Sequence, residues 1–246
     1  MSPRDWDAAA YDRLAAPMTR WGRAVVDRLD LQGDERVLDA GCGTGKVTAM
    51  LRERLPNGEI VALDASASMV ALARERLGQD RVTYVVADLQ ESLPVEPPVD
   101  AVLSTATFHW IPDHDRLFGN LASMMRRGAQ LVAQCGGRGN LASVEAALRD
   151  MGEGFAGRKH YAGPEDTRAR LEAAGFIGVE AWLQKEPTPL DRADLEPYLA
   201  TIILGDHLEG MGENERRRFV HEVAMRLPTG AIDYVRLNIT ARRAPR

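Results

Sequence analysis

The sequence predicts an α/β protein in which a mainly parallel sheet is covered by helices on both faces. Short apolar runs without polar alternation are separated by helical stretches over the first 135 residues, as expected for buried parallel strands joined by helices. A glycine-rich turn follows the first strand, and an acidic residue stands at or just beyond the end of each of the first three strands. The 246 residues of the chain suffice for one such domain with insertions.

Strands and helices can be placed in order along the chain from these patterns. The expected strands are 36–39, 60–63, 82–86, 101–104, 130–134, 176–185 and 231–242. The expected helices are 5–30, 46–55, 66–77, one that starts near Asp113 or Asp115, 141–151, 164–174, 190–204 and 213–227. Apolar residues recur at three- and four-residue steps in the longer helices, and Pro164 and Gly175 bracket one of them.

Three segments of different character divide the chain. Residues 1–30 are expected to form an N-terminal helical segment that closes over a ligand. Residues 31–186 and 229–246 are assigned to the core that contains the sheet. Residues 187–228 hold two helical stretches between the last two strands, and we interpret them as a helical cap insertion.

Composition and charge indicate a cytoplasmic globular protein that binds neither nucleic acid nor membrane. The net charge of -5 disfavours contact with phosphate backbones. Cys42 and Cys135 stand far apart, which gives neither a zinc motif nor a disulfide framework. The N-terminus lacks the pattern of a signal or transit peptide, and no apolar run approaches the roughly 20 residues of a membrane helix. We therefore expect a monomer or homodimer without a metal site.

The segment Val37–Gly45 combines a strand, a glycine-rich turn and a helix start, which together make a nucleotide-binding element. A P-loop requires Ser or Thr after its Lys, whereas Val47 follows Lys46 here. The dinucleotide fingerprint has two residues between its second and third glycines, whereas one residue separates Gly43 and Gly45. The spacing therefore disfavours both an NTPase and a nucleotide-dependent oxidoreductase.

The glycine turn resembles the first motif of class I S-adenosylmethionine methyltransferases, in which an acidic residue and one spacer precede G-x-G-x-G. Asp39, Gly41, Gly43 and Gly45 match that motif. The resemblance implies a Rossmann-like methyltransferase fold, with a mainly parallel seven-stranded sheet and an antiparallel last strand. It also implies that S-adenosylmethionine is the cofactor and S-adenosylhomocysteine the product. Asp39 would then lie near the amino group of the cofactor.

Two further strand ends carry acidic residues that suit the same ligand. A carboxylate at Asp64 accepts two hydrogen bonds from a ribose diol, and the resemblance places Met69 and Asp88 near the adenine. Because the carboxyl ends of parallel strands share one edge of a sheet, these side chains are expected to meet there. The expected cofactor-binding residues are Tyr11, Asp39, Gly41, Gly43, Asp64, Ala65, Met69, Asp88, Leu89 and Thr105.

The site for the methyl acceptor is expected in the loop after the fourth strand. Its stretch His109–His114 resembles the trans-aconitate methyltransferase branch of the family, as does the opening Trp6–Tyr11. Thr105 departs from the family, which normally has Asn at this position, and the departure leaves the acceptor open. His109 is the expected catalytic residue, which either orients an acceptor oxygen or acts as base for a hydroxyl. The expected substrate-binding residues are His109, Trp110, Arg138 and Tyr161.

These residues predict a methyltransferase that acts on a small molecule. Methyl transfer needs mainly alignment of the two reactants, because the cofactor is already activated. A carboxylate is ionised at neutral pH and needs no base, so O-methylation of an organic acid is the favoured reaction. Methylation of a hydroxyl, nitrogen or carbon of another metabolite is the alternative, as is a module that binds S-adenosylmethionine without turnover.

Overall fold

The computed structural model describes residues 16–93, 95–154, 159–228 and 231–245. In this part of the chain, seven strands form one sheet in the order β3-β2-β1-β4-β5-β7-β6. Their bounds are β1 Arg36–Ala40, β2 Glu59–Asp64, β3 Val82–Val86, β4 Val99–Thr105, β5 Met125–Gly136, β6 Phe176–Pro189 and β7 Ala231–Arg243. Strands β1 to β5 pair in parallel, whereas β7 runs antiparallel to both β5 and β6. The predicted fold class is confirmed.

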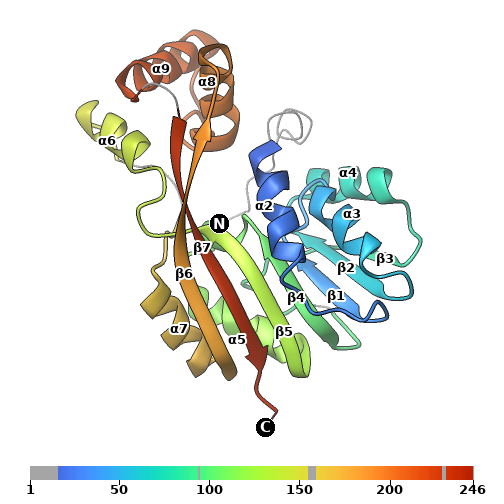
Figure 1. The fold of residues 1–246 in the computed structure, drawn as a ribbon. Helices are drawn as coiled ribbons and strands as arrows, with labels where there is room; N and C mark the ends of the chain where they lie inside the picture. The colour runs from blue at the N-terminus through green and yellow to red at the C-terminus, as the bar shows by residue number, and fades with distance from the viewer. Residues whose placement is uncertain (1–15, 94, 155–158, 229–230, 246) are drawn as a thin grey trace.

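Helices lie on both faces of the sheet (Figure 1). Helices α2 (Ala16–Val26), α3 (Lys46–Glu53) and α4 (Ala67–Leu77) cover one face, and α5 (His114–Met124) and α7 (Pro164–Ala173) cover the other. In the central strand β4, Leu103 packs in the cluster of the first face and its neighbour Val102 in the cluster of the second. Both faces of this strand are buried, which explains why its sequence shows no polar alternation.

A second group of helices gathers beyond the ends of β6 and β7 (Figure 1). It contains α6 (Ala142–Asp150), α8 (Arg192–Tyr198), the π-helix η2 (Leu199–Ile203) and α9 (Glu213–Arg226). Their buried side chains form a separate apolar cluster, which also includes Trp21 of α2 and Tyr234 of β7. The hydroxyls of Tyr198 and Tyr234 lie 2.7 Å apart in this cluster and tie the helices to the sheet. The division into core and cap at residues 187–228 stays a prediction.

Strand β5 begins at Met125, five residues before its expected start, and ends at Gly136, two residues beyond its expected end. Two further elements differ from the sequence expectation. Strand β6 continues to Pro189, four residues beyond the expected end, and includes Pro187. Prolines are tolerated there because β6 is the edge strand, where an amide on the outer side needs no partner in the sheet. The expected helix 190–204 is divided into α8 and η2, and the amide of Leu204 bonds the carbonyl of Leu199 at 2.8 Å, five residues back.

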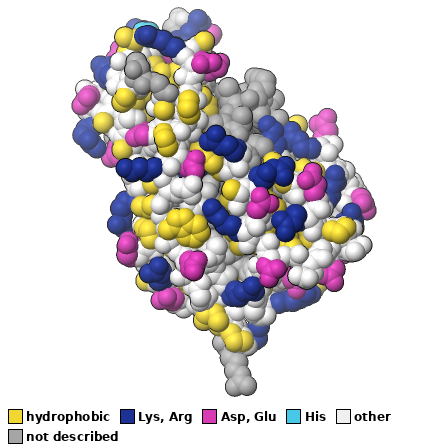
Figure 2. All heavy atoms as spheres, viewed as in Figure 1, with side chains coloured by type: hydrophobic (Ala, Val, Ile, Leu, Met, Phe, Trp, Pro, Cys, Tyr) yellow, Lys and Arg dark blue, Asp and Glu magenta, His cyan; other side chains and the backbone are white. Residues whose placement is uncertain are grey.

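The described helices include none that is long and apolar enough to cross a membrane. On the face shown in Figure 2, lysines and arginines are interspersed with aspartates and glutamates. This face therefore carries no broad area of a single charge, and the charged clusters that matter for binding are local.

The central strand supplies a direct test of the packing. Leu103 is fully buried, so Leu103→Ala leaves a cavity and should lower the free energy of unfolding by about 2–5 kcal/mol. Leu183, on edge strand β6, is 38% exposed, and Leu183→Ala should cost less than about 1 kcal/mol. Urea denaturation of both variants measures the difference. Equal losses would contradict the placement of β4 in the centre of the sheet.

Candidate active site

The side chain of Asp39, near the end of β1, is completely buried below the glycine turn. Its Oδ2 accepts a hydrogen bond of 2.7 Å from the hydroxyl of Thr48 on α3. Its Oδ1 is also buried and has no hydrogen-bond partner among the residues that the structure describes. Burial raises the pKa of Asp39 to about 7, the bond from Thr48 opposes that rise, and the negative charge of Asp64 adds to it. The free oxygen suits a cationic or N–H ligand group, which would lower this pKa again.

The glycine turn brings backbone close to the carboxyl end of β4. Gly41 has a φ of 88°, and a Cβ on it would lie 2.0 Å from Oγ1 of Thr107, so no other residue fits this position. Gly43 has a φ of 53°, but a Cβ there would meet no atom of the described residues within 4 Å. The surface beside Gly43 is thus open, as a cradle for a ligand requires.

Asp64 ends β2 beside this open surface. Its Oδ2 accepts from the amide of Gly43 and its Oδ1 from the amide of Ser66, each at 2.9 Å. The two bonds hold the carboxylate in one orientation and join the ends of β1 and β2. Burial raises the pKa of Asp64, and these bonds oppose the rise. Each oxygen of an ionised carboxylate has a second lone pair, which can accept from a diol.

The remaining cofactor-binding candidates on this side surround Asp64. Ala65 follows it directly, and the amide of Met69 bonds Oγ of Ser66, which caps α4. The amide of Ala87 donates to the carbonyl of Asp64, which places Asp88 next to the end of β2. Oδ1 of Asp88 accepts from the amide of Gln90 at 2.9 Å. The structure therefore brings Asp39, Gly41, Gly43, Asp64, Ala65, Met69 and Asp88, with Leu89 beside it, to one edge of the sheet.

The chain turns sharply where β4 ends. Thr105 is the last residue of β4, and Ala106 after it has a left-handed φ of 55°. Oγ1 of Thr107 donates to the carbonyl of Thr105 at 3.0 Å, and the short 3-10 helix η1 (Phe108–Trp110) follows. Phe108 is buried against the core. This turn carries His109 from the cofactor side toward the carboxyl end of β5.

His109 is buried, and its orientation is fixed by β5. The amide of Gly136 donates to Nδ1 of His109 at 3.3 Å. Burial lowers the pKa of His109 well below its usual value, and the positive charges of Arg236 and Lys159 lower it further. The imidazole is therefore neutral, and because Nδ1 accepts, Nε2 must carry the proton. His109 thus offers an N–H donor at Nε2 rather than a basic lone pair.

Two aromatic side chains lie next to the imidazole. The ring of Trp110 is 5.2 Å from that of His109, and the ring of Tyr161 stacks on it at 5.9 Å. Nζ of Lys159 lies 4.8 Å above the ring of Trp110 and donates to the carbonyl of Ile203 at 2.7 Å. We refer to His109, Trp110, Lys159, Tyr161 and Arg236 as the His109 cluster.

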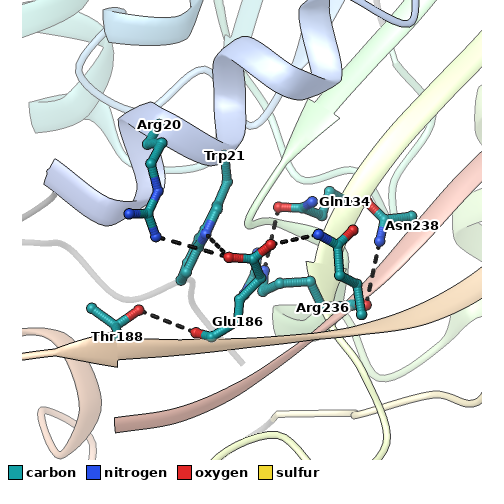
Figure 3. Close-up of polar contacts among 8 residues, drawn as sticks. Arg20, Trp21, Gln134, Glu186, Thr188, Arg236 and Asn238 are labelled. Carbon is teal, nitrogen blue, oxygen red and sulfur yellow. Dashed lines mark hydrogen bonds and ion pairs between the residues drawn. The ribbon is translucent and has the colours of Figure 1, made fainter. Parts of the chain in front are cut away.

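Arg236 of β7 approaches the same place from the sheet. Its side chain is 3% exposed, and its guanidinium lies 4.5 Å from the centroid of the Trp21 ring. Its Nε donates to Oε1 of Gln134 at 3.4 Å (Figure 3). Gln134 in turn donates to Asn238 at 2.8 Å. An arginine is therefore held between α2 and the sheet by contacts with an indole and an amide.

Two of the expected site residues stand apart from this arrangement. Tyr11 lies outside the described residues. Arg138 is exposed, and its guanidinium pairs with Asp166 at 3.0 Å and with Glu165 at 3.9 Å on α7. These two carboxylates pair with the guanidinium that was expected to hold the carboxylate of a substrate. We therefore leave Arg138 out of the acceptor site that we propose.

Sequence reasoning did not single out Arg236 or Lys159. Arg236 occupies an inward position in an alternating strand, between Tyr234 and Asn238, and a charged residue at such a position was the available signal. Lys159 follows residues 155–158 and carried no pattern of its own. Within the described ranges, no group of three or more His, Cys, Asp or Glu side chains is placed to hold a metal ion.

Comparisons with known sequences agree with the geometry at the glycine turn. A family model described as a methyltransferase domain matches residues 37–128. A trans-aconitate 2-methyltransferase of Methylobacterium nodulans is 37% identical over 180 residues, which are 73% of this chain and 67% of that protein. An enzyme of the same name from Azoarcus sp. is 38% identical over 129 residues, 52% of this chain and 50% of its own length. The match thus spans about half the length of several of these relatives.

Solved structures with the same fold include proteins named as methyltransferases. Phosphoethanolamine N-methyltransferase 2 of Haemonchus contortus, in complex with S-adenosylhomocysteine, superposes with a TM-score of 0.66 at 22% identity, over 97% of this chain and 57% of that chain. YcgJ of Bacillus subtilis superposes with a TM-score of 0.65 at 16% identity, over 92% and 99% of the two chains. These structures show that the fold is shared. The 37% identity to the Methylobacterium nodulans enzyme, over 73% of this chain and 67% of that protein, shows that the chain belongs to the S-adenosylmethionine-dependent methyltransferases.

Proposed function

We propose that the protein transfers the methyl group of S-adenosylmethionine to a carboxylate of a small organic acid. The observation that carries this proposal is the N–H donor of neutral His109, whose environment contains the two cations Arg236 and Lys159. A donor and two positive charges favour an anionic acceptor. Relatives named trans-aconitate 2-methyltransferase support an acid as the acceptor.

The acidic edge of β1 and β2 is the proposed cofactor site. Oδ1 of Asp39 would accept from the amino group of the cofactor, and Asp64 would accept from the ribose hydroxyls. Gly41 and Gly43 let the backbone approach the ligand. Asp88, Leu89, Ala65 and Met69 would surround the adenine, and Thr105 and Tyr11 complete the proposed set. When bound, S-adenosylmethionine supplies a methyl carbon activated by its sulfonium, so that an oxygen can displace the sulfur without an acid or a metal.

The His109 cluster is the proposed acceptor site. The Nε2–H of His109 would donate to one oxygen of the reacting carboxylate and leave the other oxygen to attack. Trp110 and Tyr161 flank the imidazole and would exclude water from the acceptor. The helical cap, residues 187–228, would close the site from beyond the carboxyl ends of the strands. A carboxylate loses no proton in this reaction, so no side chain has to act as a base.

A hydroxyl acceptor is the second candidate, and it makes a different demand on His109. The imidazole would have to accept a proton at Nε2, which carries the hydrogen in the tautomer inferred from the Gly136 bond to Nδ1. The tautomer would have to be reversed, at the loss of the bond from the Gly136 amide. This conflict favours the carboxylate over the hydroxyl.

Asp64→Ala should weaken S-adenosylmethionine binding by about 1–3 kcal/mol, because charge-assisted hydrogen bonds to the ribose are lost. Titration calorimetry on the folded variant measures the change. Asp80→Ala, which removes an exposed carboxylate with 83% side-chain exposure, is the matched control and should leave the affinity unchanged. Unchanged affinity in Asp64→Ala would remove Asp64 from the site.

Cofactor affinity should depend on the protonation of Asp39. Because the pKa of Asp39 is about 7, the carboxyl is protonated in acid and cannot pair with the cofactor's ammonium group. Binding should therefore weaken as pH falls from 8 to 5.5, by roughly 10- to 30-fold, and should release protons near pH 7. Calorimetry in buffers of different ionisation enthalpy counts those protons. Asp39→Asn keeps the bond from Thr48 but should abolish both effects. A pH-independent affinity in the wild-type protein would contradict this role.

The raised pKa of Asp39 also determines how the stability of the folded protein changes with pH. The folded protein without cofactor holds the Asp39 proton more tightly than the unfolded chain, whose carboxyl has a pKa near 4. The contribution of this group to stability is full below about pH 4 and is lost as pH rises toward 7. Comparison of the wild-type protein with Asp39→Asn across this range isolates the contribution.

His109→Gln separates an orienting role from that of a base. A glutamine amide also donates a hydrogen bond, so turnover of an acid at saturating cofactor should fall by about tenfold or less. Removal of a general base would lower it by about 10²–10⁴-fold. At saturating cofactor, the rate of the wild-type enzyme should be flat between about pH 6 and 8, since the lowered pKa keeps His109 neutral. His221→Gln, at an exposed histidine of α9, is the control. A collapse of the His109 variant would favour the hydroxyl acceptor.

A further inference from the structure

We propose that Asn120 of α5 is the positioning residue that makes the cofactor site select adenine rather than hypoxanthine. The inference rests on the proposed function, because it concerns the adenine end of the cofactor site given there. It adds a residue that touches no ligand and acts through the turn that does.

The turn that would contact the adenine is closed by its own hydrogen bonds. The amide of Glu91 donates to the carbonyl of Asp88, and the amide of Gln90 donates to Oδ1 of Asp88, each at 2.9 Å. The side-chain amide of Gln90 adds a longer bond of 3.5 Å to the same oxygen. Among the described residues, the bonds to this carboxylate thus fall on Oδ1, and Oδ2 can accept from a ligand. We refer to residues 88–91 as the adenine turn.

The side chain of Asn120 holds the adenine turn against α5. Its Nδ2 lies 2.9 Å from the carbonyl oxygen of Leu89 and 2.9 Å from that of Glu91. Carbonyl oxygens only accept, so the nitrogen of the Asn120 amide must face them, and its two hydrogens serve the two bonds. One side chain therefore fixes the orientation of two peptide groups in a turn of four residues.

Other contacts hold the adenine turn in place without fixing its orientation. Before the turn, the amide of Ala87 donates to the carbonyl of Asp64 at 3.1 Å, which ties the chain to β2. The side chain of Leu89 is 4% exposed and packs in the same apolar cluster as Leu117 of α5. Because apolar contacts have no direction, this packing does not determine where the peptide groups point. The two bonds from Asn120 do.

Orientation matters because adenine offers two neighbouring groups of opposite character. In the proposed site, its N6 amino group would donate to Oδ2 of Asp88, and its N1 would accept from the amide of Leu89. Hypoxanthine has an acceptor at O6 and a donor at N1, so it would leave both protein groups without a partner.

Hypoxanthine is rejected only while the amide of Leu89 keeps pointing at the ligand. The carbonyl of the same peptide group, that of Asp88, accepts from the amide of Glu91, and Asn120 holds Glu91 in turn. Without Asn120 the peptide group could rotate and offer its carbonyl to the donor at N1 of hypoxanthine. Asn120 would therefore set the selectivity of the site as well as its affinity.

A second contact between α5 and the adenine turn supplies the matched control. Nη2 of Arg116 lies 3.0 Å from Oε2 of Glu91, and the two side chains are 54% and 64% exposed. Solvent screens such a pair, so it contributes little to the position of the turn. Arg116 stands one helical turn before Asn120 on α5. Arg116→Gln thus removes a contact between the same helix and the same turn.

The test is titration calorimetry with S-adenosylhomocysteine and S-inosylhomocysteine, which differ only in the purine. The wild-type protein should bind the adenine ligand roughly 100-fold more tightly. In Asn120→Ala, the affinity for S-adenosylhomocysteine should fall about tenfold and that for S-inosylhomocysteine should change less than about threefold, so the preference drops to roughly tenfold. Asn120→Asp has a similar shape but presents oxygens to the two carbonyls, and it should lose at least as much. Arg116→Gln should keep the wild-type preference.

The Asn120 variants are expected to fold. Asn120 is only half-buried, and alanine favours the helix, so Asn120→Ala removes the two bonds without weakening α5. Thermal melting without ligand compares the stability of the variants with that of the wild-type protein. Should one Asn120 variant be unfolded, the other one carries the comparison of the two ligands.

The outcomes separate this inference from the proposed function. If the wild-type protein binds neither ligand, the proposed cofactor site fails and this inference fails with it. If the wild-type protein binds S-adenosylhomocysteine but the Asn120 variants weaken both ligands equally, or neither, Asn120 has no part in selectivity. The inference is then overturned and the proposed function stands. Equal affinity of the wild-type protein for the two ligands also overturns it.

Discussion

The antiparallel pairing of β7 between β5 and β6 is the constraint on which the acceptor side depends. A parallel last strand would place its amino-terminal residues at the far edge of the sheet, away from the ends of β1 and β4. In the observed pairing, Arg236 is opposite Gly136, and the strand that supplies the cation is held by the strand that orients His109. Arg236 and His109 are 127 positions apart in sequence, and this register brings both of them to Gly136.

The glycines of the two sites do different physical work. Gly41 has no Cβ, which lets Thr107 approach the turn. Gly136 has no Cβ either, which leaves room for Tyr161 to stack on His109. In both places a missing Cβ brings two segments that are distant in sequence into contact. In contrast, no atom from the described part of the chain lies within 4 Å of a Cβ built on Gly43. Close packing around the site and an open surface within it are therefore encoded by the same residue type.

The parallel half of the fold was predictable because its signals are local. The strands are recognised by their unbroken apolar runs, and the site by Asp39 before the glycines and Asp64 at the end of a strand. None of these signals requires knowing how the strands pair. Strand β6 was predicted too short, because the local effect of Pro187 outweighed the fact that edge strands tolerate proline. Arg236 and Lys159 were missed for a related reason. Their importance comes from contacts with Trp21, Trp110 and β5, and no short window of sequence contains those contacts.

Charge divides the candidate site into two halves. The carboxylates Asp39 and Asp64 gather at the ends of β1 and β2, whereas the cations Arg236 and Lys159 flank the end of β5. The cofactor carries positive charge on its sulfonium and its amino group, so the acidic half favours it. A carboxylate substrate is attracted by the half with the cations and repelled by the half with Asp39 and Asp64. His109, neutral and fixed by Gly136, stands on the basic side as an uncharged donor. In the reaction that we propose, this separation would order the two ligands before any contact specific to the reaction is made, and it would bring an anionic oxygen toward the cationic sulfonium.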